Sequence, residues 1–268
     1  MIPNILSIAG SDPSGGAGIQ ADIKAICANG GYAMAAITAL TAQNTSGVSA
    51  VEMVPPDMIV AQIAAIRSDI RIDAVKIGML GDARTVAAVA DALDGLQAPI
   101  VLDPVMVAKG GDRLLAPDAV AALRDLLVPR AAVLTPNLPE AADLLGTPEA
   151  ADLQAMQAQG ERLRALGAEA VLIKGGHLAG PMATDLLLTR DGVIELSTPR
   201  TNTRNTHGTG CTLSSALAAR LGAGDPPPQA ARRAKAYIAA AIAASDRLSV
   251  GHGHGPVHHF HAQDGTLA

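Results

Sequence analysis

The chain has 268 residues and a formal net charge of −5; 49% of its residues are hydrophobic, 17% are charged and 1% are aromatic. This balance excludes a disordered chain, and the acidic charge with so few stacking rings argues against nucleic-acid binding. Two cysteines are too few for a disulfide framework, and no apolar run approaches the roughly 20 residues of a membrane span. We therefore expect a cytoplasmic protein with no membrane segment.

Short apolar runs alternate with longer amphipathic segments along the chain. In chain order, the pattern predicts strands at 5–9, 35–40, 74–77, 100–102, 132–134 and 170–173. It predicts helices at 16–28, 57–68, 83–93, 117–126, 152–166, 210–221 and 229–248. Asp191-Gly192, between the apolar runs 186–189 and 193–196, indicates a hairpin at one edge. This alternation is typical of a mostly parallel sheet covered by helices on both faces, and without a linker we expect one α/β domain over residues 1–268.

Polar and glycine residues follow the predicted strands. An open parallel sheet binds its ligands outside the carboxyl ends of the strands. The segments at those ends are Gly10–Gly18, Gln43-Asn44, Gly78-Met79, Asp103–Met106, Thr135–Glu140 and Lys174–Gly176. We therefore expect these segments to line one shared crevice.

The strongest local signal is the segment Asn205–Thr212, which opens an apolar helix. Gly208 and Gly210 let the backbone approach a ligand, and the free N–H groups of a helix N-terminus favour an anion such as phosphate. Cys211 lies in the first turn, where a thiol is expected to have a lowered pKa and to act as a base or nucleophile. The alternatives are a plain glycine turn before a packed helix and a small buried cysteine.

Three side chains with oxygen atoms and one lysine also follow predicted strands. Asp103, Asn137 and Glu140 offer the oxygen atoms that Mg²⁺ prefers, although Asn137 and Glu140 also have the spacing of a helix cap. Lys174 ends an apolar strand beside two glycines, which favours a phosphate contact over a solvated surface charge.

Two more features allow two interpretations each. Asp22 follows the glycine-rich segment Gly10–Gly18; it either hydrogen-bonds a small substrate or lies at an exposed helix position. The tail Gly251–His261 carries five histidines, but no Cys, Asp or Glu completes a usual ligand set there. A docked tail is therefore favoured over a metal site.

Several motifs together resemble one known family, the bacterial hydroxymethylpyrimidine/phosphomethylpyrimidine kinases of thiamine biosynthesis. The matching segments cover nearly the whole chain in order: Gly10–Asp22, Thr38–Thr45, Lys76–Leu80, Asp103–Lys109, Thr135–Ala141, Lys174–His177, Thr206–Thr212 and Gly253–His261. The resemblance implies a ribokinase-like fold, a three-layer α/β/α sandwich around a mostly parallel sheet, usually as a homodimer. It also implies ATP-dependent phosphorylation of 4-amino-5-hydroxymethyl-2-methylpyrimidine, first to the monophosphate and then to the diphosphate.

The resemblance also implies roles for individual residues. Gln43 and Asp22 match the residues that grip the pyrimidine, and those that add apolar contacts match Ala17, Met79 and Val107. ATP phosphates and Mg²⁺ are expected near four residues: Asp103, Asn137, Glu140 and Lys174. The turn Gly208–Cys211 matches the anion hole, with Gly208, Gly210, Lys174 and Cys211 as the catalytic set.

Cys211 stands where ribokinase-type sugar kinases carry an aspartate base, and a thiolate would accept the alcohol proton in the same way. The nearest alternative is a pyridoxal or pyridoxine kinase on the same fold, and a more distant one is a non-catalytic protein that binds a pyrimidine or a B6 vitamer. In either kinase the expected partners are small molecules and a second copy of the chain, with no nucleic acid and no membrane.

Overall fold

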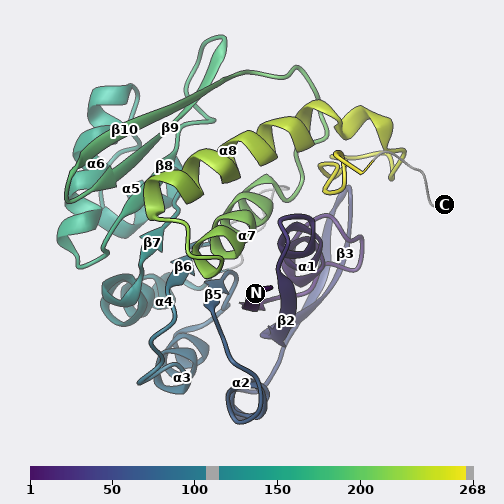
Figure 1. The fold of residues 1–268 in the computed structure, drawn as a ribbon, viewed down its shortest axis with the longest axis vertical. Helices are drawn as coiled ribbons and strands as arrows, with labels where there is room; N and C mark the ends of the chain where they lie inside the picture. Colours follow the sequence, from purple (N-terminus) through teal and green to yellow (C-terminus); the bar gives the residue numbers. More distant parts are fainter. Residues whose placement is uncertain (107–114, 264–268) are drawn as a thin grey trace.

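A computed structural model describes residues 1–106 and 115–263 of the chain, which form a central sheet between two layers of helices (Figure 1). The central sheet has eight strands: β1 (Asn4–Ala9), β2 (Tyr32–Ile37), β5 (Ala74–Ile77), β6 (Ile100–Leu102), β7 (Val133–Leu134), β8 (Val171–Lys174), β9 (Met182–Thr189) and β10 (Gly192–Pro199). Their order across the sheet is β10-β9-β8-β7-β6-β5-β1-β2, and of these eight β9 alone runs in the direction opposite to the others. The predicted mostly parallel sheet is confirmed.

Helices cover both faces of this sheet. The helices are α1 (Gly18–Ala28), α2 (Pro56–Arg67), α3 (Ala83–Ala92), α4 (Pro117–Ala122), α5 (Leu138–Leu145), α6 (Leu153–Ala165), α7 (Thr209–Gly222) and α8 (Pro227–Ala243). Short π and 3₁₀ turns extend α4 and α8: Leu123–Leu127, Val128–Arg130 and Ser245–Arg247. Helices α1, α7 and α8 pack on one face and α2 to α6 on the other (Figure 1). Among the described residues, no helix combines the length and the apolar character that crossing a membrane requires.

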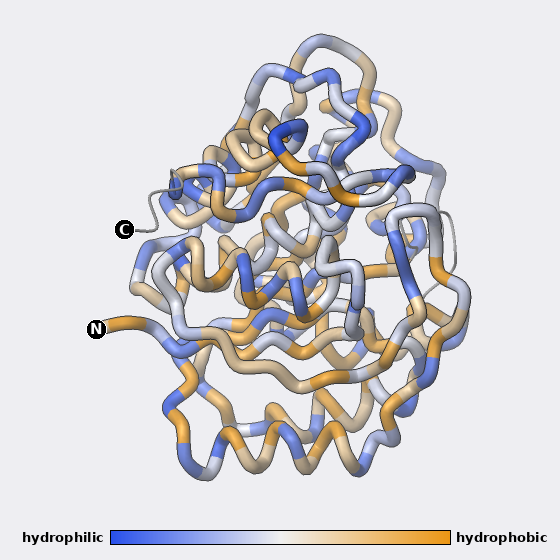
Figure 2. Tube along the Cα trace, turned by 90° about the vertical axis from the view of Figure 1, so that its right-hand side faces the viewer, coloured by the Kyte–Doolittle hydropathy of each residue, from blue (hydrophilic) through white to orange (hydrophobic). Residues whose placement is uncertain are grey.

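The alternation of side chains along each strand explains the two cores. In β1, Leu6 and Ile8 join the core under α2 to α6, while Ile5 joins the core under α1, α7 and α8. Because side chains of a strand point alternately to opposite faces, a strand buried on both faces is mostly apolar. Burial of each large aliphatic side chain contributes about 1.5–3 kcal/mol. In Figure 2, hydrophobic and hydrophilic residues alternate along α2, the helix at the bottom of the view.

The structure differs from the sequence-based elements at two places near the crevice. A second, two-stranded antiparallel sheet, β3 (Ala39–Asn44) and β4 (Gly47–Met53), lies beyond the end of β2, where the sequence analysis placed one strand at 35–40. Helix α5 follows β7 directly and was not predicted as a helix. The hairpin at the other edge is confirmed, with Thr189 paired to Gly192 around Arg190-Asp191.

Candidate active site

A cleft of about 1050 Å³ opens at the carboxyl ends of the parallel strands. Segments from the ends of β1, β5, β6, β7 and β8 line it, together with β3 and the N-terminal turn of α7. The predicted site residues that line it are Ala17, Gln43, Met79, Asp103, Asn137, Glu140, Lys174, Gly208, Gly210 and Cys211. The predicted shared crevice is therefore confirmed. Val107 lies outside the described residues.

The glycine turn that begins α7 is shaped by contact with the loop before α1. Gly208 precedes the helix with φ 74°, a left-handed conformation that favours glycine. A Cβ atom at Gly208 would overlap the carbonyl oxygen of Gly16, so no other residue fits there. A Cβ atom at Gly210 would lie 3.2 Å from Lys174 Nζ and 3.6 Å from an oxygen of Asp103. The turn therefore faces the charged groups at the ends of β6 and β8.

Lys174 and Asp103 form the charged centre of the cleft. Lys174 Nζ donates to Asp103 Oδ1 at 2.8 Å and lies 3.8 Å from Glu140 Oε2. Burial works against the charged form of Asp103, but Lys174 and Lys76 outweigh it and lower the pKa of this carboxyl group. Asp103 also accepts hydrogen bonds from Thr135 at 3.2 Å and Ser214 at 3.3 Å. The lysine is thus held, charged, next to the glycine turn.

Asn137 and Glu140 form the capping box of α5. The Asn137 side chain accepts from the Glu140 backbone N–H, and Glu140 Oε2 accepts from the Asn137 backbone N–H, both at 2.8 Å. The capping alternative is therefore confirmed for this pair. Burial raises the pKa of Glu140 to about 7 against the opposing effect of Lys174. The cap fixes Asn137 and Glu140 relative to each other, and a metal-binding role for either side chain stays a prediction.

The sequence profile of the family described as phosphomethylpyrimidine kinase matches residues 12–258, a span that includes all the predicted site residues that line the cleft. The chain is 54% identical over 260 residues to the hydroxymethylpyrimidine/phosphomethylpyrimidine kinase of Salmonella typhimurium, covering 97% of this chain and 98% of that protein. This chain belongs to the phosphomethylpyrimidine kinase family.

Two further comparisons add to this assignment. The chain is 47% identical over 262 residues to the thiamine biosynthesis bifunctional protein ThiED of Geobacter sulfurreducens, covering 97% of this chain and 53% of that longer protein. The fold superposes on an ADP complex of the pyridoxal kinase of Bacillus subtilis with a TM-score of 0.89 and 38% identity, covering 97% of this chain and 98% of that one. The expected ribokinase-like fold is confirmed by this similarity.

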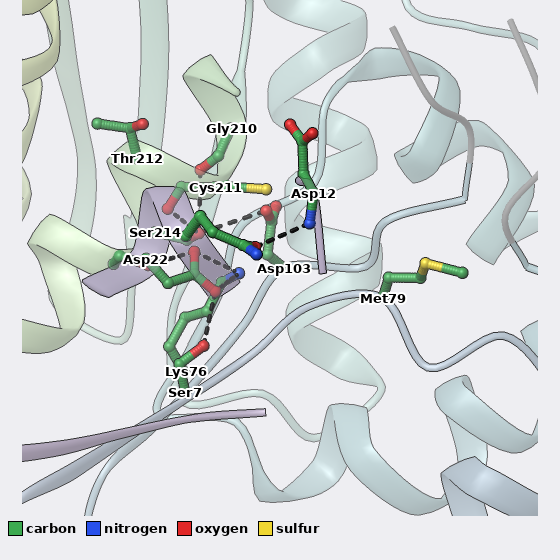
Figure 3. Close-up of polar contacts among 12 residues, drawn as sticks. Ser7, Asp12, Asp22, Lys76, Met79, Asp103, Gly210, Cys211, Thr212 and Ser214 are labelled. Atoms are coloured by element: carbon green, nitrogen blue, oxygen red, sulfur yellow. Dashed lines mark hydrogen bonds and ion pairs between the residues drawn. The ribbon is translucent and has the colours of Figure 1, made fainter. Parts of the chain in front are cut away.

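Cys211 differs from its expected electrostatic state. It is half-buried at the start of α7, beside Gly210 in the cleft (Figure 3). The prediction of a lowered pKa is wrong for this structure: burial raises the pKa of the Cys211 thiol to about 11. Lys76 and the backbone N–H of Gly18 act in the opposite direction but only partly offset burial.

Asp22 is not a direct substrate ligand in this structure. Its carboxylate is completely buried beneath the cleft and is not part of the lining (Figure 3). Both of its oxygens accept from Lys76 Nζ, at 2.8 and 2.9 Å. Ser7 and Ser215 donate to the same two oxygens at 2.6 and 2.8 Å. The expectation that Asp22 grips the pyrimidine is therefore wrong, because every strong acceptor position is used inside the protein.

The three residues predicted to contact the pyrimidine that also line the cleft are Gln43, Met79 and Ala17. Gln43 lies at a bulge in β3, with its Oε1 accepting from Thr41 Oγ1 at 3.3 Å and its Nε2 lying 3.4 Å from His207 Nε2. The Met79 sulfur would lie 3.0 Å from a Cβ atom at Gly10, so Met79 covers the end of β1. The cleft is therefore lined by both a polar amide and apolar side chains.

The sequence analysis missed a pair that joins the two glycine loops. His207 Nε2 lies 2.7 Å from Asp12 Oδ2, which also accepts from the Ala17 backbone N–H at 2.8 Å. A Cβ atom at Gly16 would overlap the His207 ring. Asp12 and His207 are 195 positions apart, so their spacing gives no sign of a contact. The only signal in the sequence is that each lies within one of the segments that match the family.

The histidine-bearing tail is docked as predicted. His254 N–H donates to Thr45 O at 2.8 Å at the tip of the β3–β4 hairpin, and His207 N–H donates to Gly255 O at 3.0 Å. His259 is 5% exposed, and its Nε2 lies 3.0 Å from Thr212 Oγ1 in α7. No group of three His, Cys, Asp or Glu among the described residues could hold a metal ion. The tail therefore joins the hairpin that carries Gln43 to the start of α7.

Proposed function

We propose that the chain transfers the terminal phosphoryl group of ATP to 4-amino-5-hydroxymethyl-2-methylpyrimidine, and then a second one to the resulting monophosphate, for thiamine biosynthesis. The observation that carries the proposal is one cleft lined both by the glycine turn with Lys174 and by Gln43. The Salmonella and Geobacter relatives support the substrate and the pathway.

At the pyrimidine end of the cleft, the Gln43 amide recognises the pyrimidine ring by hydrogen bonds. An amide donates and accepts at once, which matches a ring nitrogen next to an exocyclic amino group. Ala17 and Met79 supply the apolar surface for the methylated ring.

At the phosphate end, Lys174 and the N–H groups of the turn Gly208–Cys211 stabilise the transferring phosphoryl group. Donors that are already fixed in place are effective where negative charge develops in the transition state. Lys174 is fixed by Asp103 at 2.8 Å, and the turn is fixed by its contact with Gly16.

The donor set fits a Mg²⁺ ion that is bound mainly by ATP. Mg²⁺ is commonly held by one or two carboxylates plus substrate phosphates and waters. Glu140 lines the cleft, and its Oε1 has no hydrogen-bond partner in the described part of the chain. Glu140 and Asp103 would hold the ion against the phosphates, where it supplies neutralisation of their charge.

The first transfer needs a proton acceptor, and we assign this role to Cys211, which lines the cleft. The Cys211 thiolate takes the proton of the hydroxymethyl group, and the alcohol oxygen forms a bond to the γ-phosphorus. The bond from that phosphorus to the bridging oxygen of ADP breaks, and ADP leaves with the electron pair. The thiol then returns its proton to water. In the second transfer the attacking atom is an anionic phosphate oxygen, so no base is required.

We also propose a homodimer in the cytoplasm. Each of the strands β2, β3 and β4 carries an exposed apolar side chain, namely Tyr32, Leu40 and Val51, and contact with a second copy would cover apolar surface of this kind. Light scattering on a size-exclusion column tests it; a mass of one chain at micromolar concentration would contradict it. The location rests on the unpaired cysteines and on the need for ATP.

ADP release from purified protein tests the function directly. We expect ATP-dependent ADP release with the pyrimidine alcohol and with its monophosphate, each with a kcat/KM above that for pyridoxal. The similarity to a pyridoxal kinase makes pyridoxal the necessary comparison. A larger kcat/KM for pyridoxal would favour that alternative, and background release with every alcohol would favour a binding protein.

A further inference from the structure

The buried ion pair between Lys76 and Asp22 has no role in the mechanism so far. Lys76 lies in β5 at the centre of the sheet and is the largest side chain that is completely buried among the described residues. Its ammonium group donates to both oxygens of Asp22, at 2.8 and 2.9 Å. Removing two charges from water costs free energy that their mutual attraction often only offsets, so a buried ion pair need not stabilise the fold. The position of this pair therefore suggests a function.

The pair lies directly beneath Cys211. Ser215, which donates to Asp22 at 2.8 Å, follows Cys211 by four positions in α7, so both lie on the same face of this helix, one turn apart. Figure 3 shows Asp22 and Lys76 under the turn that carries Cys211 and Gly210. Lys76 also contributes to the floor of the cleft, and a Cβ atom at Gly78 would lie 2.7 Å from its ammonium nitrogen.

The surroundings of Lys76 favour its charged form. Burial alone would favour the neutral amine, but Asp22, Cys211 and Asp103 outweigh it and raise the pKa of Lys76. Asp22 cannot turn away, because Ser7 and Ser215 also donate to its oxygens. The ammonium group is therefore fixed in place before any substrate binds.

The charges around Cys211 have opposing effects. Among the described groups, Lys76 favours the thiolate most strongly, Asp22 and Asp103 disfavour it, and the N–H of Gly18 at the start of α1 supports it by a hydrogen bond. Lys174 also interacts with Cys211 from the side of β8. We propose that Lys76 is a positioning residue that acts through Cys211, its buried ammonium group stabilising the thiolate that accepts the alcohol proton. This inference rests on the proposed role of Cys211.

Alkylation of Cys211 by iodoacetamide tests the inference without reference to kinase activity. The measurement uses a Cys27→Ala background, because Cys27 is exposed. When the pKa of a thiol rises by one unit, its thiolate fraction falls about tenfold, but the remaining thiolate becomes more nucleophilic. The alkylation rate therefore falls by only about threefold. We expect Lys76→Met to slow alkylation at pH 8 by about threefold or more, and Asp22→Asn to accelerate it by a similar factor.

The opposite signs separate an electrostatic effect from a loosened structure, since loosening would accelerate both variants. Lys235→Met is the matched control: Lys235 also lines the cleft and pairs with a buried carboxylate, Asp185, at 2.7 Å. We expect it to leave the alkylation rate unchanged. Where Lys76→Met alone does not fold, the double variant Lys76→Met/Asp22→Asn removes both charges and is expected to react more slowly than the Cys27→Ala parent.

Kinase assays then connect the thiol to the reaction. Lys76→Met is expected to lower kcat for the alcohol on the order of tenfold more than kcat for the monophosphate, because only the first transfer needs the base. Alkylation at the parental rate in Lys76→Met, or in the double variant, would overturn the inference. A chain that shows the expected alkylation order but phosphorylates no pyrimidine would instead contradict the proposed function.

Discussion

The tail residue His259 gives a prediction whose size follows from the structure. It is buried, and burial with the nearby positive charges of Lys24 and His258 lowers its pKa from 6.5 to about 4. The folded protein therefore keeps His259 neutral while the unfolded chain binds a proton as pH falls below 6.5. The contribution of neutral His259 to the free energy of unfolding is therefore fully present above pH 6.5. It is lost as pH falls toward 4, by about 2 kcal/mol at pH 5 and about 3 kcal/mol at pH 4.

Glu140 acts with the opposite sign over an overlapping range. Its pKa rises from 4.5 to about 7, so the folded state holds a proton that the unfolded chain releases. Its contribution is full below pH 4.5 and is lost as pH rises through 7, also by about 2 kcal/mol between pH 5 and pH 7. The two effects nearly cancel, so the wild-type curve hides both of them.

Single variants separate the two groups. Urea unfolding at pH 5 and pH 7 is measured for wild type, His259→Gln and Glu140→Gln. Relative to wild type, His259→Gln is expected to gain about 2 kcal/mol on going from pH 7 to pH 5, and Glu140→Gln to lose about 2 kcal/mol. Parallel curves for wild type and His259→Gln would refute the account of a neutral, buried His259.

Three further variants test the site. Cys211→Ala is expected to slow alcohol phosphorylation by about 10²–10⁴ and monophosphate phosphorylation by less than about tenfold. The wild-type rate with the alcohol should rise from pH 7 to pH 9 because the thiol pKa is about 11. Equal losses of rate on both substrates would show that Cys211 does not accept the proton. Gln43→Ala should raise KM for the pyrimidine and leave KM for ATP unchanged, and an unchanged pyrimidine KM would dismiss the amide contact. Gly208→Ala should lower the free energy of unfolding by at least about 1 kcal/mol, because Gly208 has a left-handed backbone conformation. Gly176→Ala serves as the control, because open space surrounds Gly176. Equal stability of the two variants would contradict the packing of the glycine turn on Gly16.

The strands and the crevice could be predicted because their signals are local. Apolar runs such as 100–102 and 171–173 are buried on both faces, and each is followed at once by a polar residue. The β3–β4 sheet could not be predicted in this way. Its outward positions include both Leu40 and Glu52, so the polar and apolar residues do not alternate cleanly.

The roles of Asp22 and Cys211 were misjudged because they depend on distant partners. Asp22 is 54 positions from Lys76 and 193 from Ser215, and no spacing in the sequence indicates that these groups meet. For Cys211, the sequence indicates a helix N-terminus, which lowers a thiol pKa, but it does not indicate how deeply the thiol is buried. In the structure burial is the larger effect.

A structure of the chain with a non-hydrolysable ATP analogue and the pyrimidine alcohol tests the central claim most directly. The account predicts the γ-phosphate within hydrogen-bonding distance, about 2.7–3.2 Å, of Lys174 Nζ and of N–H groups in Gly208–Cys211, with the hydroxymethyl oxygen next to the Cys211 sulfur. A triphosphate that ends away from the start of α7, or a pyrimidine bound away from Gln43, would contradict it.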